Sequence, residues 1–153
     1  MRNQLNDSLK TAVREQNKRK SSTLRLINAA IKDRDIALRA KSEDRLSDEG
    51  ILELLAKMVK QREESQRLYE EAGRLDLADQ ESEEIDIIRE FMPQQLSEEE
   101  TGDAVTGIIS EVGATGMKDM GKVMAALKAQ FAGQIDAGKA SAVVKERLSA
   151  LAG

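Results

Sequence analysis

The chain lacks the residue types on which most enzyme active sites depend. Its 153 residues include no cysteine and no histidine. The absence of cysteine excludes disulfides, thiolate metal sites and cysteine nucleophiles. Histidine is the side chain that titrates near neutral pH unaided, so its absence removes the usual general base for a serine nucleophile. We therefore expect no catalytic residue, no metal ligand and no cofactor-binding residue in this chain.

Aromatic residues, proline and long apolar runs are also scarce. Only 2% of the residues are aromatic, and a single residue is proline. The core must therefore be built from Leu, Ile, Val, Met and Ala, which helices accept readily. The longest purely apolar run, residues 123–127, is far too short to cross a membrane, and residues 1–7 lack the apolar core of a signal peptide. These absences predict a protein without membrane contact and with a cytoplasmic location.

Charge is abundant and unevenly distributed along the chain. Residues 1–41 contain 11 Lys or Arg and 4 Asp or Glu, a net charge of +7. Residues 42–100 contain 7 basic and 19 acidic residues, a net charge of −12, and residues 101–153 contain 6 basic and 5 acidic residues, a net charge of +1. The three segments add up to the net charge of −4. A basic segment followed by an acidic one is compatible with binding of a polyanion. The alternative, which we favour for most of these charges, is that the two segments lie side by side and neutralise each other.

Apolar residues recur at intervals of three and four along most of the chain, which is the spacing of an amphipathic helix. No segment shows the sustained alternation of a strand. The sequence therefore predicts an all-α fold. The seven predicted helices cover roughly residues 2–16, 22–40, 47–73, 74–92, 97–112, 117–132 and 136–151.

The ends of these helices carry recognisable signals. The polar run at residues 16–22 predicts a turn, with Ser21 or Ser22 as the cap of the second helix. Ser97 and Glu100 have the spacing of a capping box. Further caps are predicted at Ser47 and Asp136.

Pro93 marks the best domain boundary, because proline cannot continue a helix and restricts the residue before it. We expect an N-terminal domain of four helices at residues 1–93. We expect a C-terminal domain of three helices at residues 97–153, whose small size is marginal for independent folding.

The strongest candidate binding residues lie near the predicted start of the sixth helix. Gly116 precedes that helix, whose first amide groups attract phosphates. Lys118 and Lys122 are four residues apart and share a face, and Gly121 lets a partner approach closely. The alternative is that the glycines serve helix packing and the lysines solvate the surface.

A second turn carries the same residue types. Gly133 and Gly138 flank it, and Lys139 follows. If the two turns lie near each other, Lys139 joins Lys118 and Lys122 in one basic corner that grips RNA phosphates.

The N-terminal cluster Lys18, Arg19, Lys20 and Arg25 is another candidate for nucleic-acid binding. It contains no aromatic residue on which a base would stack, so any binding there rests on phosphates and is sensitive to salt. The alternative is a solvated helix corner.

Several short blocks of sequence occur together and in order along almost the whole chain. They are STLRLI at 22–27, AAIK at 29–32, KQR at 60–62, AGR at 72–74 with DLA at 76–78, FMP at 91–93 with QLS at 95–97, MKDMGKVMAAL at 117–127 and GQIDAGK at 133–139. Together they resemble the YqeY-like family. The C-terminal part is similar to the tail domain of GatB, the B subunit of the glutamine-dependent tRNA amidotransferase.

The resemblance implies a non-catalytic accessory protein. In the amidotransferase the chemistry lies in other parts of the enzyme, and the tail domain helps to hold tRNA. A label of carbon–nitrogen ligase with glutamine as amido donor would therefore be inherited from a partner. The resemblance implies tRNA or another RNA as partner, and the alternative is a protein-interaction module that docks on a partner complex. Gly116 and Gln134 depart from the Ser and the basic residue that family members often carry, and Gln134 removes one phosphate contact.

Overall fold

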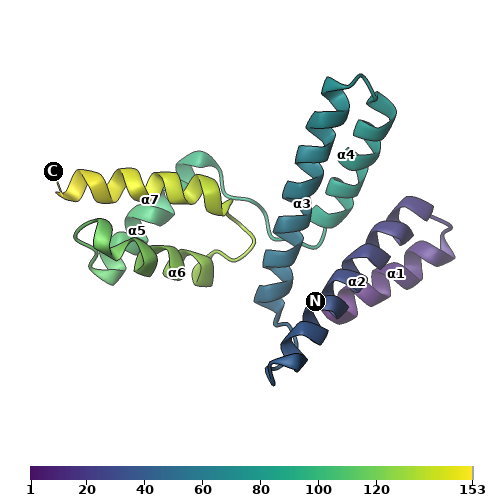
Figure 1. Cartoon of the computed structure of the whole chain (residues 1–153), viewed down its shortest axis with the longest axis horizontal. Helices are drawn as coiled ribbons and strands as arrows, with labels where there is room; N and C mark the ends of the chain where they lie inside the picture. The colour runs from purple at the N-terminus through teal and green to yellow at the C-terminus, as the bar shows by residue number, and fades with distance from the viewer. Residues whose placement is uncertain (153) are drawn as a thin grey trace. The chain divides into compact units, whose positions relative to one another are not determined.

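The computed structural model describes residues 1–152, and this range contains helices and no strands (Figure 1). The all-α prediction is confirmed. The chain divides into two compact units, of which the first is Met1–Pro93 and the second begins at Gln94. Within residues 1–152, no helix combines the length and the apolar character that crossing a bilayer requires.

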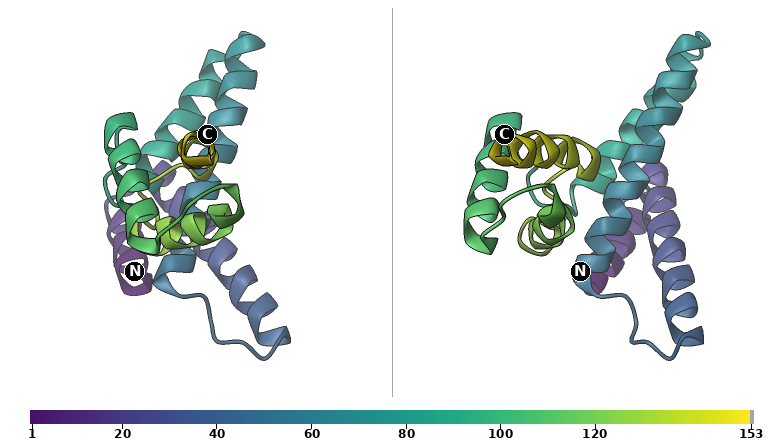
Figure 2. Two further views of the ribbon diagram at one scale, coloured as in Figure 1. Left: turned by 90° about the vertical axis from the view of Figure 1, so that its left-hand side faces the viewer. Right: turned by 60° about the vertical axis from the view of Figure 1, so that its left-hand side comes forward.

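Unit 1 consists of two helical hairpins. Its helices are α1 (Arg2–Arg14), α2 (Lys18–Ala40), α3 (Asp48–Glu71) and α4 (Leu75–Arg89). Helix α2 packs against the other three helices, and α3 and α4 run side by side in every view (Figures 1 and 2). The largest fully buried side chains of the core are aliphatic. They are Leu5, Leu24, Ile27, Ile51, Leu55 and Ile88.

The connection between α1 and α2 differs from the predicted one. Helix α2 begins at Lys18, and its cap is Asn17, whose side chain accepts a hydrogen bond from the Lys20 amide at 3.1 Å. Gln16, at φ 58°, turns the chain in the left-handed conformation just before this cap. The predicted turn is therefore present at Gln16 but shorter than 16–22, because it ends at Asn17.

Ser21 and Ser22 lie inside α2 and do not cap it, contrary to prediction. Ser21 is buried, and its hydroxyl donates to the Asn17 carbonyl at 2.8 Å. Asn is as good a cap as Ser, so the earlier residue is used. The consequence is that the basic residues at 18–20 occupy the first turn of α2.

The other predicted caps are confirmed. The Ser47 hydroxyl accepts from the Gly50 amide at 3.1 Å. Ser97 and Glu100 form the predicted capping box, with hydrogen bonds of 3.0 and 3.1 Å. Asp136 accepts from two amides of the following turn.

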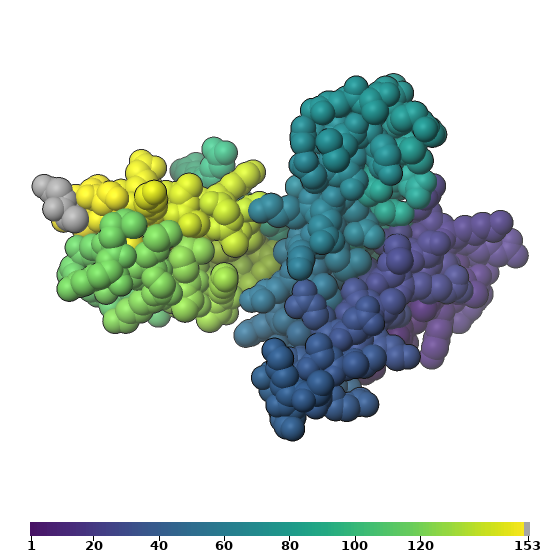
Figure 3. Space-filling view, in the orientation of Figure 1, coloured from purple at the N-terminus to yellow at the C-terminus, as the bar shows by residue number. Residues whose placement is uncertain are grey.

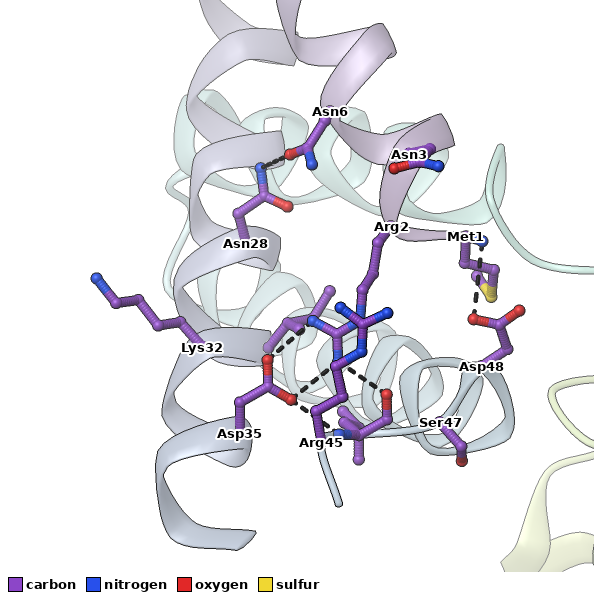
Figure 4. A pocket seen from close by; sticks show the side chains of 12 residues that line it. Met1, Arg2, Asn3, Asn6, Asn28, Lys32, Asp35, Arg45, Ser47 and Asp48 are labelled. Carbon is purple, nitrogen blue, oxygen red and sulfur yellow. Dashed lines mark hydrogen bonds and ion pairs between the residues drawn. The ribbon is translucent and has the colours of Figure 1, made fainter. Parts of the chain in front are cut away.

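One ion pair ties the start of α1 to α2 and to the loop before α3. Both terminal nitrogens of Arg2 donate to the Asp35 carboxylate, at 2.8 and 2.9 Å, and Arg2 also donates to the Leu46 carbonyl at 2.8 Å (Figure 4). The Leu46 amide donates back to Asp35 at 2.8 Å. The hydrogen bonds from Arg2 and then from Leu46 lower the pKa of Asp35 to about 2. Asp35 is therefore an anion that stabilises three segments at once.

Unit 2 is a bundle of three α-helices and one short 3-10 turn. Its elements are α5 (Glu98–Val112), η1 (Met117–Asp119), α6 (Met120–Gln130) and α7 (Ala137–Ala152). The three α-helices pack pairwise around a second aliphatic core. Helices α6 and α7 are antiparallel and joined by a short loop (Figure 1). The Leu96 amide donates to the Gln134 carbonyl of that loop at 2.8 Å, which fixes the segment before α5.

Asp35→Asn is expected to destabilise the protein at pH 7 and to lose that effect in acid. The pKa of Asp35 in the folded chain lies below its ordinary value of 3.8, so its stabilisation is present above about pH 4 and disappears as pH falls toward about 2. Urea midpoints of wild type and variant, measured across this pH range, test the expectation. Asp33→Asn, on the same helix but exposed, is the control. If the difference in urea midpoint between wild type and Asp35→Asn does not become smaller in acid, the charge of Asp35 is not the source of the stabilisation.

Candidate nucleic-acid interface

The segment around Gly116 forms a tight turn before α6 begins. Residues 117–119 make the 3-10 turn η1, and α6 starts at Met120, so the predicted helix from Met117 to Ala132 is too long at both ends. The Asp119 carboxylate accepts from the Thr115 amide at 2.9 Å, and this hydrogen bond is the main cause of the lowered pKa of Asp119. One amide of the predicted phosphate site is thus already occupied by an anion. Gly116 is extended and unstrained.

The exposed side of α6 is the most regular cationic surface of unit 2. Its residues, here called the α6 face, are Lys118, Gly121, Lys122, Ala125 and Lys128, and all five are exposed. At 100° per residue the four residues within α6 lie within an arc of about 120°, and Lys118 precedes them in η1. Helix α6 contains no Asp or Glu. None of the three lysines forms an ion pair with any residue in the range 1–152.

Sequence reasoning missed Lys128. It lies six residues after Lys122, a spacing that is neither three nor four. Lys128 lies at the edge of the α6 face because it is three residues after Ala125, and residues three apart are neighbours on a helix surface. A helical projection of residues 117–132 would have found this lysine.

The structure brings Lys118 and Lys122 together and leaves Lys139 apart. Lys139 is exposed in the first turn of α7, next to the α6–α7 loop. Lys118 precedes α6, at the other end of this antiparallel hairpin (Figure 1). The 11 residues of α6 extend about 16 Å. Lys139 therefore lies about one length of α6 from Lys118 along the hairpin.

The glycines of the second turn have structural roles. Gly133 is buried at φ 73°, and its carbonyl accepts a hydrogen bond from the side-chain amide of Gln95. The amide of Gly138 donates to the Asp136 cap at 2.8 Å. Both glycines thus shape the loop that joins α6 to α7.

The N-terminal cluster divides into paired and unpaired cations. The Arg19 guanidinium lies 3.1 Å from the Glu83 carboxylate, and the Lys20 ammonium lies 3.1 Å from Glu90. Both acids belong to the acidic middle of the chain, so here the two segments do neutralise each other. Lys18 and Arg25 are exposed, and neither forms an ion pair within the range 1–152.

The acidic residues between α3 and α4 are engaged in structure. Arg62 pairs with the buried Glu84 at 3.1 Å and also donates to the Met58 carbonyl. Burial raises the pKa of the neighbouring Glu81, and the charge of Glu84 adds to this effect. Among residues 1–152, no group of three or more acidic side chains is arranged to hold a metal ion.

Comparison with known proteins identifies relatives of this chain. A protein named "Altered inheritance of mitochondria protein 41, mitochondrial" from Clavispora lusitaniae is 35% identical over 108 residues, which are 69% of this chain and 61% of the relative. A Saccharomyces cerevisiae protein of the same name is 33% identical over 90 residues, 59% of this chain and 47% of the relative. The chain thus spans less than two thirds of the length of these curated relatives.

These relatives correct one expectation from the sequence. The cytoplasmic location inferred from composition is contradicted, because both matching relatives are named as mitochondrial proteins. Composition was a poor guide here, since the absence of an apolar segment excludes neither compartment. The family model described as Yqey-like protein matches residues 2–148, which is nearly the whole chain. This chain therefore belongs to the Yqey-like protein family.

Proposed function

We propose that this protein is a non-catalytic accessory factor that holds RNA, with tRNA as the first candidate, through the phosphates of its backbone. The α6 face is the surface that makes these contacts in unit 2. The observation that carries the proposal is that this face presents three unpaired, exposed lysines and no acid. The resemblance of this region to the tRNA-holding tail of the amidotransferase supports it.

The residues between the lysines favour close contact with a backbone. Gly121 has no atom within 4 Å of the position that a Cβ would take, and Ala125 is exposed beside it. A smooth surface of small residues lets a phosphate reach the flanking ammonium groups. The α6 face has no aromatic side chain, so it offers no base stacking. Binding is therefore expected to depend on salt and only weakly on sequence.

A protein-docking module is the second candidate function. Leu68 and Leu75 are 52% and 63% exposed, and both lie within one turn of the connection between α3 and α4. Exposed leucines at the tip of a hairpin are suited to insertion into a partner's groove. Such a partner would bind unit 1. Substitution of Leu68 would weaken its binding, and substitution of the lysines of the α6 face would not.

Lys118→Gln combined with Lys122→Gln is expected to weaken tRNA binding and its salt dependence. Each lost phosphate contact lowers the slope of log K against log salt by roughly 0.7 to 0.9, so the double variant should lose about 1.4 to 1.8 from the slope. Fluorescence anisotropy of labelled tRNA across a salt series measures this.

The control is Lys57→Gln combined with Lys60→Gln, which makes the same change in net charge at two exposed lysines of α3. Lys139→Gln, tested alone, should have less effect than either lysine of the α6 face. Equal losses in the double variant and its control would mean that net charge alone matters. Absence of tRNA binding by the wild type at low salt would remove the proposed function and favour the docking module.

Gly121→Ala is expected to stabilise the protein and yet weaken RNA binding. Nothing lies within 4 Å of a Cβ at Gly121 or at Gly107, which is an exposed glycine within α5. Alanine is favoured over glycine in a helix by up to about 1 kcal/mol, so both variants should raise the melting temperature. Gly107→Ala is the matched control, and its RNA affinity should equal that of the wild type. Unchanged RNA affinity in Gly121→Ala would contradict close approach at this position.

A further inference from the structure

Four cations recur at intervals of seven residues along the whole of α2. They are Lys18, Arg25, Lys32 and Arg39, here called the α2 stripe. Seven residues at 100° each fall 20° short of two turns, so all four cations lie within an arc of about 60°. Consecutive members are about 10.5 Å apart along the axis, and the stripe extends about 32 Å. Figure 3 shows α2, in indigo, at the surface of unit 1.

The stripe is free of acidic residues and of internal partners. The residues between the cations on this face are Ser22, Ala29 and Ile36, and all seven positions are exposed. No cation of the stripe forms an ion pair with any residue in the range 1–152. The neighbouring Arg19 and Lys20 are neutralised by α4. The α2 stripe is thus the part of the basic N-terminal segment that keeps a regular spacing along α2 and has no ion pair within residues 1–152.

A polar hollow of about 660 Å³ adjoins the stripe at Lys32. Asn3 and Asn6 of α1, Asn28 and Lys32 of α2, and Arg45 of the following loop line it (Figure 4). Asn28 donates to Asn6 across the two helices at 3.4 Å.

The acid of α2 that lines the hollow is already neutralised. Asp35 is held by both nitrogens of Arg2 and by the Leu46 amide. The charges of Lys32 and Arg45 have no such partner within the range 1–152. The other acid of the hollow, Asp48, lies 3.7 Å from the N-terminal ammonium of Met1. Lys32 and Arg45 therefore carry the excess positive charge from the stripe into the hollow.

A linear polyanion fits this surface better than a lipid bilayer or an acidic protein. The apolar side of α2 is buried in the core of unit 1, so the helix has no apolar face to insert into lipid. A protein interface needs apolar or aromatic anchors at its centre, and the stripe offers only Ile36. A nucleic-acid duplex is densely charged, with about one negative charge every 1.7 Å in DNA, so a duplex that follows the line of the stripe offers a phosphate near each of the four cations.

The absence of aromatic side chains points to duplex and not to single-stranded RNA. The seven residues of this face include no aromatic residue, and single strands are held largely by base stacking. Double-helical RNA is recognised through its phosphates and its shape.

We propose that the α2 stripe, together with the hollow beside Lys32, binds the phosphate backbone of double-helical RNA. This inference rests on the proposed function and adds to it a site in unit 1, separate from the α6 face. The cations of the stripe act as separate point contacts to phosphates of the duplex backbone.

The test compares Arg25→Gln combined with Lys32→Gln against the Lys57→Gln and Lys60→Gln control. All four side chains are exposed in unit 1, and the two double variants change the net charge equally. The probes are a blunt RNA duplex of about one and a half turns, a single strand of the same length, vesicles containing phosphatidylserine, and polyglutamate. Binding is measured by anisotropy and by vesicle sedimentation across a salt series, with circular dichroism to confirm that each variant is folded.

The expected result is a loss of about 1.8 from the duplex salt slope and roughly tenfold weaker duplex binding at low salt, with little change in the control. Equal effects in the two double variants would overturn the inference. So would a loss confined to vesicles, polyglutamate or the single strand. If the wild type binds RNA and only the Lys118→Gln and Lys122→Gln double variant binds it more weakly, the proposed function stands and this inference fails. If the wild type binds no RNA, the proposed function itself fails.

Discussion

Burial of aliphatic side chains between helices is the interaction on which both units depend. Each Leu or Ile moved out of water contributes roughly 1.5–3 kcal/mol, and the largest fully buried side chains of both units are aliphatic. Glu84 is the only charged residue buried within the range 1–152, and Arg62 neutralises it. The hydroxyls of the buried Ser21 and Thr23 donate to backbone carbonyls of α2 and its cap. Charge is abundant at the surface, where the shape is set by helix faces.

The helices were predictable from the sequence because their apolar spacing reflects this burial. Their ends were predictable only where one hydrogen-bonding residue had no competitor, as at Ser47 and Ser97. At the start of α2 the sequence offers both Asn17 and Ser21, and the structure uses the earlier residue. Before α6 the Asp119 carboxylate turns back onto Thr115 and delays the helix by three residues. Both helix starts, of α2 and of α6, were predicted wrongly because several local hydrogen bonds compete there, and the sequence does not show which of them forms.

The candidate sites were harder to predict, because charge pairing across helices is invisible in the sequence. Arg19 and Glu83 are 64 residues apart in sequence but 3.1 Å apart in space. This pairing removes Arg19 from the predicted cluster, whereas Lys18 remains free. Lys139 resembled Lys118 by its glycine-flanked turn, yet the antiparallel hairpin separates them. Lys32 and Arg39 were overlooked because their relation to Lys18 emerges only when α2 is known to be one unbroken helix.

The seven-residue repeat on α2 also fixes a handedness. Each interval falls short of two full turns, so a line drawn through the four cations winds around the helix in a left-handed sense. A straight rod laid along α2 would therefore leave the line toward its ends. A partner that contacts all four cations must either curve around α2 or cross the axis of α2 at an angle. The same mismatch that makes coiled coils supercoil thus converts a regular spacing of charges into a preferred crossing direction between this helix and whatever binds it.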